Sequence, residues 1–286
     1  MSGKKILITG PTGMLGSILL EALPESIGLR RELNILKSEK LHEELEKIAP
    51  DIIIHTAAFT NVELCETQKD EAYKINVLGT QNLVNYCTNR DTLFVYISST
   101  GIYGTQNAHE PYNEFDAVYP TTVHHQSKYE GEKAVINHLN RYLIIRTGWL
   151  YGGDKTHAKN FVYKRYLEAS NKDVIYSNNS QIGNPTSVYE LVEQIKTLIQ
   201  SSQYGVFNCV NSAKNISRYD YVKKIIELFE LDCTVSIAEK GMFERVAPVS
   251  HNESAQNYKL DLLNLNVMGA WDDALSQYIN QLKSEI

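Results

Sequence analysis

The sequence has little of what marks secreted, membrane-spanning or metal-stabilised proteins. Its 286 residues include only four cysteines, which are widely scattered and form no Cys-x-x-Cys pair, so we expect neither a disulfide framework nor a structural metal site. No apolar run reaches the roughly 18–20 residues that a membrane span requires. The N-terminus lacks the layout of a signal peptide and leads directly into a strand-like run. We therefore expect a reduced, cytoplasmic protein that does not act at membranes.

Positive charge is also scarce. The chain has 28 Lys and Arg against 34 Asp and Glu, a formal net charge of −6, which argues against a nucleic-acid or anionic-membrane partner. No acidic quartet suited to a structural Mg²⁺ stands out, so no metal is predicted. Hydrophobic residues make up 43% of the chain and charged residues 22%, as in ordinary globular proteins. At this length we expect one large domain with a smaller lobe.

Apolar runs alternate with helical patterns through the first half of the chain. Strand-like runs are predicted at 4–9, 51–55, 92–97 and 141–146, separated by helical patterns at 15–23, 38–48, 66–86 and 121–139. Strands that are apolar almost throughout are typical of a parallel sheet buried on both faces. The predicted fold class is therefore α/β, a Rossmann-type doubly wound parallel sheet.

The pattern of predicted strands and helices changes after residue 152. Helices are predicted at 158–169, 187–199, 218–229 and 271–281, separated by short strands at 174–176, 206–209 and 233–237. The chain has no internal repeat and no Pro/Gly-rich linker. We expect an NAD(P)-binding domain at 1–152, to which some later segments return, and a smaller, interwoven α/β lobe at 153–286 that binds the substrate.

A glycine-rich turn follows the first predicted strand and opens the first helix. It reads Thr9-Gly10-Pro11-Thr12-Gly13-Met14-Leu15-Gly16. Glycines in this place permit a tight turn, close approach of the backbone to a pyrophosphate and close packing of helix on strand, while the helix N-terminus meets the anion. The alternative is a glycine-rich turn without a ligand. Because the turn opens a β-α-β series, we favour a dinucleotide site.

The end of the second strand bears on the choice of dinucleotide. Enzymes that use NAD place an acidic residue there for the ribose 2′-hydroxyl, whereas arginine accommodates a 2′-phosphate. Here Arg30 and Arg31 stand where the acid is expected. This favours NADP(H) over NAD(H), the alternative being that both arginines are solvated surface charges.

Several motifs in order along the chain resemble one known superfamily. They are Thr9 to Gly16, His55-Thr-Ala-Ala-Phe-Thr60, Tyr73-Lys-Ile-Asn-Val-Leu-Gly-Thr80, Ser98-Ser-Thr-Gly-Ile-Tyr-Gly104, Arg146-Thr-Gly-Trp-Leu-Tyr-Gly152, Asn160-Phe-Val162 and Gln181-Ile-Gly-Asn-Pro-Thr186. Together they resemble the extended short-chain dehydrogenase/reductase superfamily, and within it the dTDP-4-dehydrorhamnose reductase family. The resemblance runs from about residue 4 to residue 280 and includes the Rossmann-type cofactor turn.

The resemblance implies an NAD(P)H-dependent reductase of a nucleotide-activated 4-keto-6-deoxy sugar. Residues implied to bind the cofactor are Gly10, Gly13, Met14, Leu15, Gly16, Arg30, Arg31, Asn34, Ala57, Ala58, Phe59 and Lys128. Those implied to bind the substrate are Ser99, Thr100, Trp149 and Asn160, with Ser99 bonding the reacting carbonyl. Thr100 stands where the family usually has an acidic residue. Related proteins often pair through helices of the large domain, which suggests a homodimer.

The implied catalytic set of Ser99, His124 and Lys128 departs from the family at one position. The superfamily's acid is a tyrosine four residues before a lysine, and this chain has His124 before Lys128. Tyr129 is no substitute, because the next residue on a helix points about 100° away. Three readings stay open: His124 donates the proton in an altered reductase, His124 or His125 is the base of a keto-sugar epimerase, or the protein is a catalytically impaired regulatory protein that binds nucleotides.

Other polar residues have simpler interpretations. We expect His125 to face away from the site, His55 to be hydrogen-bonded at a buried strand end, and Asn76 to satisfy backbone groups. The family's basic residue before a late-loop proline is displaced, because Arg245 precedes Pro248 by three residues. The sequence therefore leaves open how the usual nucleotide diphosphate is recognised.

Overall fold

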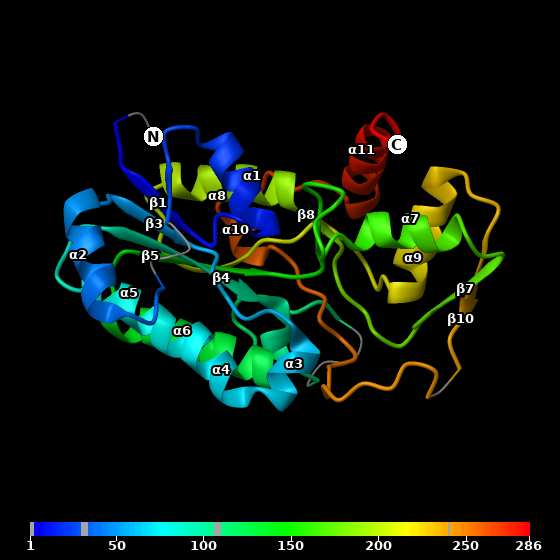
Figure 1. Cartoon of the computed structure of the whole chain (residues 1–286), viewed down its shortest axis with the longest axis horizontal. Helices are drawn as coiled ribbons and strands as arrows, with labels where there is room; N and C mark the ends of the chain where they lie inside the picture. The colour runs from blue at the N-terminus through cyan, green and yellow to red at the C-terminus, as the bar shows by residue number, and fades with distance from the viewer. Residues whose placement is uncertain (1–2, 30–33, 106–109, 240) are drawn as a thin grey trace.

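A computed structural model describes residues 3–29, 34–105, 110–239 and 241–286 (Figure 1). The strands are β1 (Ile6–Thr9), β2 (Ile27–Gly28), β3 (Ile52–His55), β4 (Leu93–Ser99), β5 (Tyr142–Thr147), β6 (Leu150–Tyr151), β7 (Val174–Ser177), β8 (Thr186–Ser187), β9 (Gly205–Asn208) and β10 (Thr234–Ile237). The helices are α1 (Met14–Ala22), α2 (Ser38–Ile48), α3 (Val62–Thr67), α4 (Lys69–Tyr73), π-helix η1 (Lys74–Gly79), α5 (Thr80–Cys87), 3₁₀-helix η2 (Thr100–Tyr103), α6 (Val123–His138), α7 (Phe161–Ala169), α8 (Val188–Gln200), α9 (Arg218–Phe229), α10 (Tyr258–Leu262) and α11 (Trp271–Lys283).

A six-stranded parallel sheet organises the larger part of the molecule. Its order is β2-β1-β3-β4-β5-β9, and every described pair in it is parallel. The strand order reverses direction between β1 and β3, where Thr9 pairs with His55. In open α/β sheets the ligand crevice lies at the carboxyl ends of the strands at such a switch point. The predicted doubly wound parallel sheet is confirmed.

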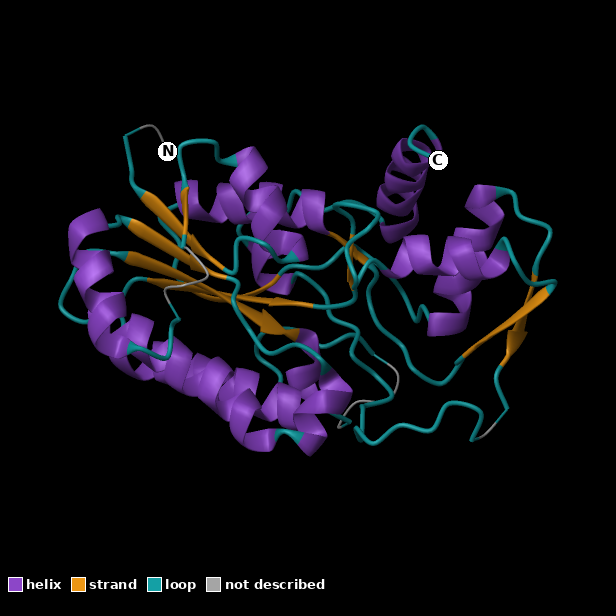
Figure 2. Cartoon of the chain, in the orientation of Figure 1, coloured by secondary structure: helices purple, strands orange, loops and turns teal. Residues whose placement is uncertain are grey.

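Alternating apolar side chains along each strand feed two separate cores. Ile6 and Ile8 of β1 pack toward α1 and α8, whereas Leu7 between them packs toward α2, α5 and α6. Figure 2 shows these helices on the two faces of the sheet. Both faces are buried, which is why the strands are apolar almost throughout.

The smaller lobe is built around α7, α9 and α11, which pack on a third core containing Tyr151, Tyr221 and Tyr278. Two short parallel pairs accompany it, β7 with β10 and β6 with β8. Two later segments belong to the large sheet: β9 is its edge strand beside β5, and α8 packs on α1. The chain thus passes between the two parts more than once (Figure 1).

The predicted helix at 66–86 is confirmed from Lys69 to Tyr86, but it is not regular: α4, η1 and α5 follow one another without a gap, and the π-helical turn between the two α-helices contains the buried Asn76. Its first two predicted residues belong to the separate helix α3. The Asn76 side chain bonds the backbone of Phe59 on both sides, accepting from its N–H at 2.7 Å and donating to its carbonyl at 3.1 Å. A tertiary contact therefore sets the local geometry, at the kind of π-turn that often marks functional sites.

Shorter elements were not predicted at all. The structure adds α10, β6 and β8, each of five residues or fewer, which are too short to show a periodic pattern. No helix in the described parts of the chain is long and apolar enough to cross a membrane.

Candidate active site

A cleft of about 1230 Å³ opens at the carboxyl ends of β1, β3 and β4. Of the predicted site residues it is lined by Gly10, Gly13, Met14, Leu15, Gly16, Asn34, Ala57, Ala58, Ser99, His124, Lys128 and Trp149. Phe59, Thr100 and Asn160 are not among its described lining residues. Arg30 and Arg31 lie outside the described residues. The structure thus brings six separate parts of the sequence to one cavity, which suits a large ligand.

The glycine turn leaves no room for side chains. Gly10 has φ of +66°, and a Cβ there would lie 2.8 Å from the backbone nitrogen of Ala57. A Cβ at Gly16 would lie 2.2 Å from the carbonyl oxygen of Gly10. No side chain caps α1, and its first turn carries no acidic residue, so its free amide groups are available to an anion. This cradle fits the pyrophosphate of a dinucleotide.

Replacement of Gly10 by alanine tests the cradle. We expect Gly10→Ala to weaken NADPH binding by at least ~10-fold, because the backbone must shift to relieve the clash with Ala57. Gly3→Ala is the matched control, since Gly3 also has positive φ, +81°, but nothing within 4 Å of its Cβ position. Binding is measured by NADPH fluorescence, and equal affinities of the two variants would contradict the assignment.

A buried chain of hydrogen bonds connects the ends of β1 and β3 beneath the cleft. The Ala57 N–H donates to the Thr9 hydroxyl at 3.2 Å, and Thr9 Oγ1 lies 2.7 Å from Nδ1 of His55. His55 Nε2 lies 3.1 Å from the Thr80 hydroxyl, which donates to the carbonyl of Asn76. Burial, and secondarily Lys128, lowers the pKa of His55 to about 3. His55 is neutral and structural, as expected.

His124 is held at the cleft by a backbone carbonyl. It lies in the first turn of α6, where the Thr122 side chain caps the helix by accepting from the N–H of His125. Its Nδ1 lies 3.1 Å from the carbonyl oxygen of Phe59, the same group that Asn76 holds. Burial is the main cause that lowers the pKa of His124 well below its usual value, and the charges of His125 and Lys128 add to it. The imidazole is therefore neutral at physiological pH.

His125 lies beside His124 but away from the cleft. The two rings are 5.1 Å apart, and the His125 ring packs directly on Gly101, where a Cβ would lie 2.1 Å from it. Burial lowers the pKa of His125 to about 4. His125 is a packing residue beneath η2, which disfavours it as an epimerase base.

Lys128 is a basic residue of α6 that lines the cleft. It lies one helical turn after His124 on α6, is 4% exposed, and places Nζ 4.0 Å from the centre of the Tyr96 ring. Burial lowers its pKa to about 7, against the opposing effect of Glu132. The Ser99 hydroxyl, at the end of β4, accepts from the N–H of Gly101 at 3.2 Å, and its own proton has no described acceptor.

Comparison with known proteins places this arrangement in a family. A family model described as the RmlD substrate binding domain matches residues 4–284. The chain belongs to this family. The resemblance to dTDP-4-dehydrorhamnose reductases is thereby confirmed, and so is the fold, through solved structures of such enzymes that match nearly the whole chain.

Three similar proteins bear on the site of this RmlD-family chain. Spore coat polysaccharide biosynthesis protein SpsK of Bacillus subtilis is 27% identical over 285 residues, covering 98% of each chain. The structure of dTDP-4-dehydrorhamnose reductase from Bacillus anthracis in complex with NADP has a TM-score of 0.92 and 30% identity, covering 97% of this chain and 99% of that one. Methionine adenosyltransferase 2 subunit beta of Rattus norvegicus is 26% identical over 285 residues, covering 93% of this chain and 83% of the relative.

Trp149 faces the cleft of this RmlD-family chain in a strained backbone conformation. Its φ is +47°, which is costly for a bulky residue. The indole N–H donates to Glu253 at 2.9 Å, and the Arg218 guanidinium lies 3.5 Å from the ring centre. The ring also packs on Gly183, where a Cβ would lie 2.4 Å from it. Surrounding groups thus fix one orientation of the ring at the cleft.

The resemblance implies that Asn160 and Thr100 bind the substrate, but neither is among the described lining residues of this cleft. Asn160 is fully buried and caps α7: its side chain accepts from the N–H of Tyr163 and donates to Tyr278 and to the carbonyl of Asp154. These bonds use both N–H donors of the amide group, and the side chain does not line the cleft. Thr100 is buried at the start of η2, facing Gly148.

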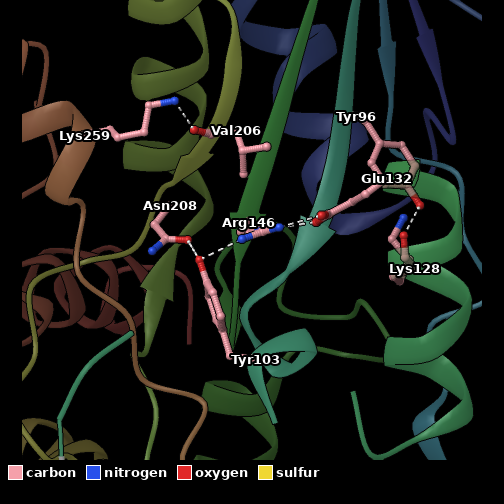
Figure 3. A network of polar contacts seen from close by, with 8 residues as sticks. All are labelled: Tyr96, Tyr103, Lys128, Glu132, Arg146, Val206, Asn208 and Lys259. Atoms are coloured by element: carbon pink, nitrogen blue, oxygen red, sulfur yellow. Dashed lines mark hydrogen bonds and ion pairs between the residues drawn. The ribbon is translucent and has the colours of Figure 1, made fainter. Parts of the chain in front are cut away.

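A buried polar network connects α6 to the neighbouring elements of the large sheet (Figure 3). Glu132 on α6 binds the Arg146 guanidinium through both oxygens, at 3.1 and 2.8 Å, and both side chains are almost entirely buried. Arg146 donates to the Tyr103 hydroxyl, which donates to Asn208. This network joins α6 to β5, η2 and β9, and so fixes the helix that carries His124 and Lys128.

Sequence reasoning missed two basic residues of the cleft, His157 and Lys159. Lys159 reaches from the smaller lobe to the hydroxyl of Thr60, which follows β3, and its charge contributes to lowering the pKa of His124. Its position directly before the Asn160-Phe161-Val162 motif was the available signal. Lys159 makes no ion pair with a described residue.

Proposed function

We propose that the protein is an NADP(H)-dependent reductase of a nucleotide-activated 4-keto-6-deoxy sugar. The observation that carries the proposal is one cleft that joins the glycine cradle to Ser99, Lys128 and Trp149 in a chain of the RmlD family. The named activity of its relatives and the NADP bound in a similar structure support it. We assign the cofactor to the large sheet and the sugar nucleotide to the smaller lobe.

The cradle at Gly10 and Gly16 would hold the cofactor pyrophosphate, and Ala57 and Ala58 would flank its rings. Reduced nicotinamide supplies a hydride to a ketone carbon, and the protein must supply the proton for its oxygen. The free Ser99 hydroxyl is suited to bond that oxygen, and the Lys128 ammonium to hold the nicotinamide ribose and stabilise developing negative charge. The fixed Trp149 ring offers a face for the sugar.

The direct test is NADPH oxidation by the full chain against a panel of nucleotide-linked 4-keto-6-deoxy sugars that vary in base and stereochemistry. We expect turnover with at least one member and none with the free sugars. Tight NADPH binding without turnover on any member would rule out the reductase proposal.

Cofactor preference is tested at the end of β2. Arg30 and Arg31 are proposed to contact the 2′-phosphate, so the Arg30→Ala, Arg31→Ala double variant should lose ~10-fold or more in NADPH affinity, while NADH affinity stays constant. Fluorescence titration with both dinucleotides measures this. An unchanged ratio of the two affinities would show that these arginines do not select NADP(H).

A second candidate is a nucleotide-binding regulatory protein with little turnover. Two observations favour it: His124 is a neutral imidazole in place of the usual phenol, and one similar protein is named as a subunit of methionine adenosyltransferase 2. Such a protein would bind NADPH and the sugar nucleotide tightly and leave both unchanged. The same panel, with binding measured beside turnover, separates the two candidates.

A further inference from the structure

The hydrogen bond to Phe59 decides which nitrogen of His124 carries the proton. A backbone carbonyl can only accept, so Nδ1, 3.1 Å from the Phe59 oxygen, is the protonated nitrogen. In the neutral ring Nε2 then holds a lone pair. Nε2 has no hydrogen-bond partner among the described residues, and the ring borders the cleft. The group at the family's acid position therefore presents an acceptor and no proton to give.

Lys128 is placed to present protons instead. Its natural helical partner, Glu132, gives both carboxylate oxygens to Arg146, so Nζ forms no ion pair with any described side chain. Nζ lies over the Tyr96 ring and its residue borders the cleft. A ring face accepts no full hydrogen bond, so the three N–H donors of the ammonium remain available to a ligand.

Among the described titratable groups around Lys128, no other presents a proton to the cleft. His124 and Glu132 flank it on α6, Tyr96 faces it from β4, and His55 lies within range on β3. His124 and His55 are neutral at physiological pH. Both oxygens of Glu132 are paired with Arg146. Tyr96 is fully buried, and its hydroxyl donates to the Lys128 carbonyl, so the phenol proton is not available in the cleft.

We propose that Lys128 is the proton donor of this site, and that His124 Nε2 accepts a hydrogen bond from a substrate hydroxyl. The inference rests on the proposed reductase function and extends it. In the step, the ketone carbon gains the hydride that reduced nicotinamide supplies, and the carbonyl oxygen gains a proton from Nζ. One N–H bond breaks and one O–H bond forms; the neutral amine then regains a proton from water.

The activity experiment compares the pH dependence of kcat/KM for ketone reduction in the wild type, His124→Gln and Lys128→Ala. Because burial lowers the pKa of Lys128 to about 7, and the protonated form is the active one, wild-type kcat/KM should fall as pH rises through 7. His124→Gln, which keeps an amide donor for Phe59, should lower kcat/KM by up to ~10-fold because the hydrogen bond to the substrate hydroxyl is weakened, but it should keep the same limb. Lys128→Ala should lose ~10²–10⁴-fold together with the limb.

Two further variants separate proton donation from positioning. Added methylamine or a related small amine should restore the activity of Lys128→Ala in proportion to the concentration of the protonated amine. Among different amines, the restored rate should follow the acidity of the amine. If Lys128 only positions the ligand, the restored rate should show no such dependence. Lys128→Met repeats the loss with a neutral side chain that keeps packing on Tyr96. Lys159→Met is the matched control, since Lys159 also lines the cleft among the described residues. The KM of this variant should change, and its pH limb should stay.

A readout that needs no turnover tests the same inference. In ¹⁵N-histidine-labelled protein, long-range ¹H–¹⁵N spectra should show His124 with protonated Nδ1 and bare Nε2, without titration between pH 6 and 8; His124→Gln assigns the signal. A protonated Nε2, a His124→Gln variant that loses the pH limb, or a Lys128→Met variant that keeps it would overturn the inference. Absence of wild-type turnover on every panel member defeats the proposed function, and the spectra still decide the state of His124.

Discussion

Replacing Glu132 by glutamine is expected to lower the free energy of unfolding by about 3–5 kcal/mol, the largest stability effect that we predict for a single conservative change. Glu132 is fully buried and binds Arg146 through both oxygens at 3.1 and 2.8 Å. The amide is nearly the same size, so no cavity forms. It carries no negative charge, however, and leaves the Arg146 guanidinium uncompensated in a site 6% exposed.

The measurement is urea unfolding at pH 7, followed by circular dichroism and tryptophan fluorescence. Glu130→Gln is the matched control: it makes the same change on the same helix, in an exposed ion pair with Lys133 at 2.6 Å. Exposed pairs contribute at most about 1 kcal/mol, so the control should unfold close to wild type. Equal destabilisation by the two variants would show that the Arg146 pair does not stabilise the protein beyond a surface contact.

The architecture could be predicted because it follows from local sequence. Buried parallel strands must be apolar along their whole length, and amphipathic helices must alternate with them. That is how α2 and α9 could be predicted with the bounds that the structure gives them. The glycine turn could be predicted for a similar reason, because its function depends on consecutive backbone atoms.

The internal supports of the site depend on contacts between distant residues, and these could not be predicted. The sequence cannot show that the Asn76 side chain hydrogen-bonds the backbone of Phe59, which lies seventeen residues earlier. Nor can it show that the Phe59 carbonyl sets the tautomer of His124, which lies sixty-five residues after Phe59. Asn160 is a further example, since the structure places the side chain of this motif residue in the cap of α7. The network around Arg146 could have been anticipated in part, because an arginine in the apolar strand predicted at 141–146 requires a buried partner.

Introducing tyrosine at position 124 is expected to raise kcat/KM for ketone reduction by about 10²-fold, within the range that a well-placed general acid contributes. A phenol carries its own proton, and beside the Lys128 ammonium its conjugate base is stabilised. The present imidazole has its only proton committed to the Phe59 carbonyl. His124→Tyr also reaches farther into the cleft, because the hydroxyl extends beyond the ring.

His124→Phe is the matched control for this gain, since it adds the same ring without a proton. We expect no increase in its kcat/KM, and the same steady-state NADPH oxidation assay measures all three proteins. The pH profile gives a second reading: the limb near pH 7 that Lys128 imposes should move to higher pH in His124→Tyr, where the phenol becomes the donor. If His124→Tyr instead binds NADPH normally and turns over more slowly than wild type, then the histidine is itself the group that transfers the proton. That result would require its ring to leave the Phe59 carbonyl when substrate binds, because only then could Nε2 carry the proton.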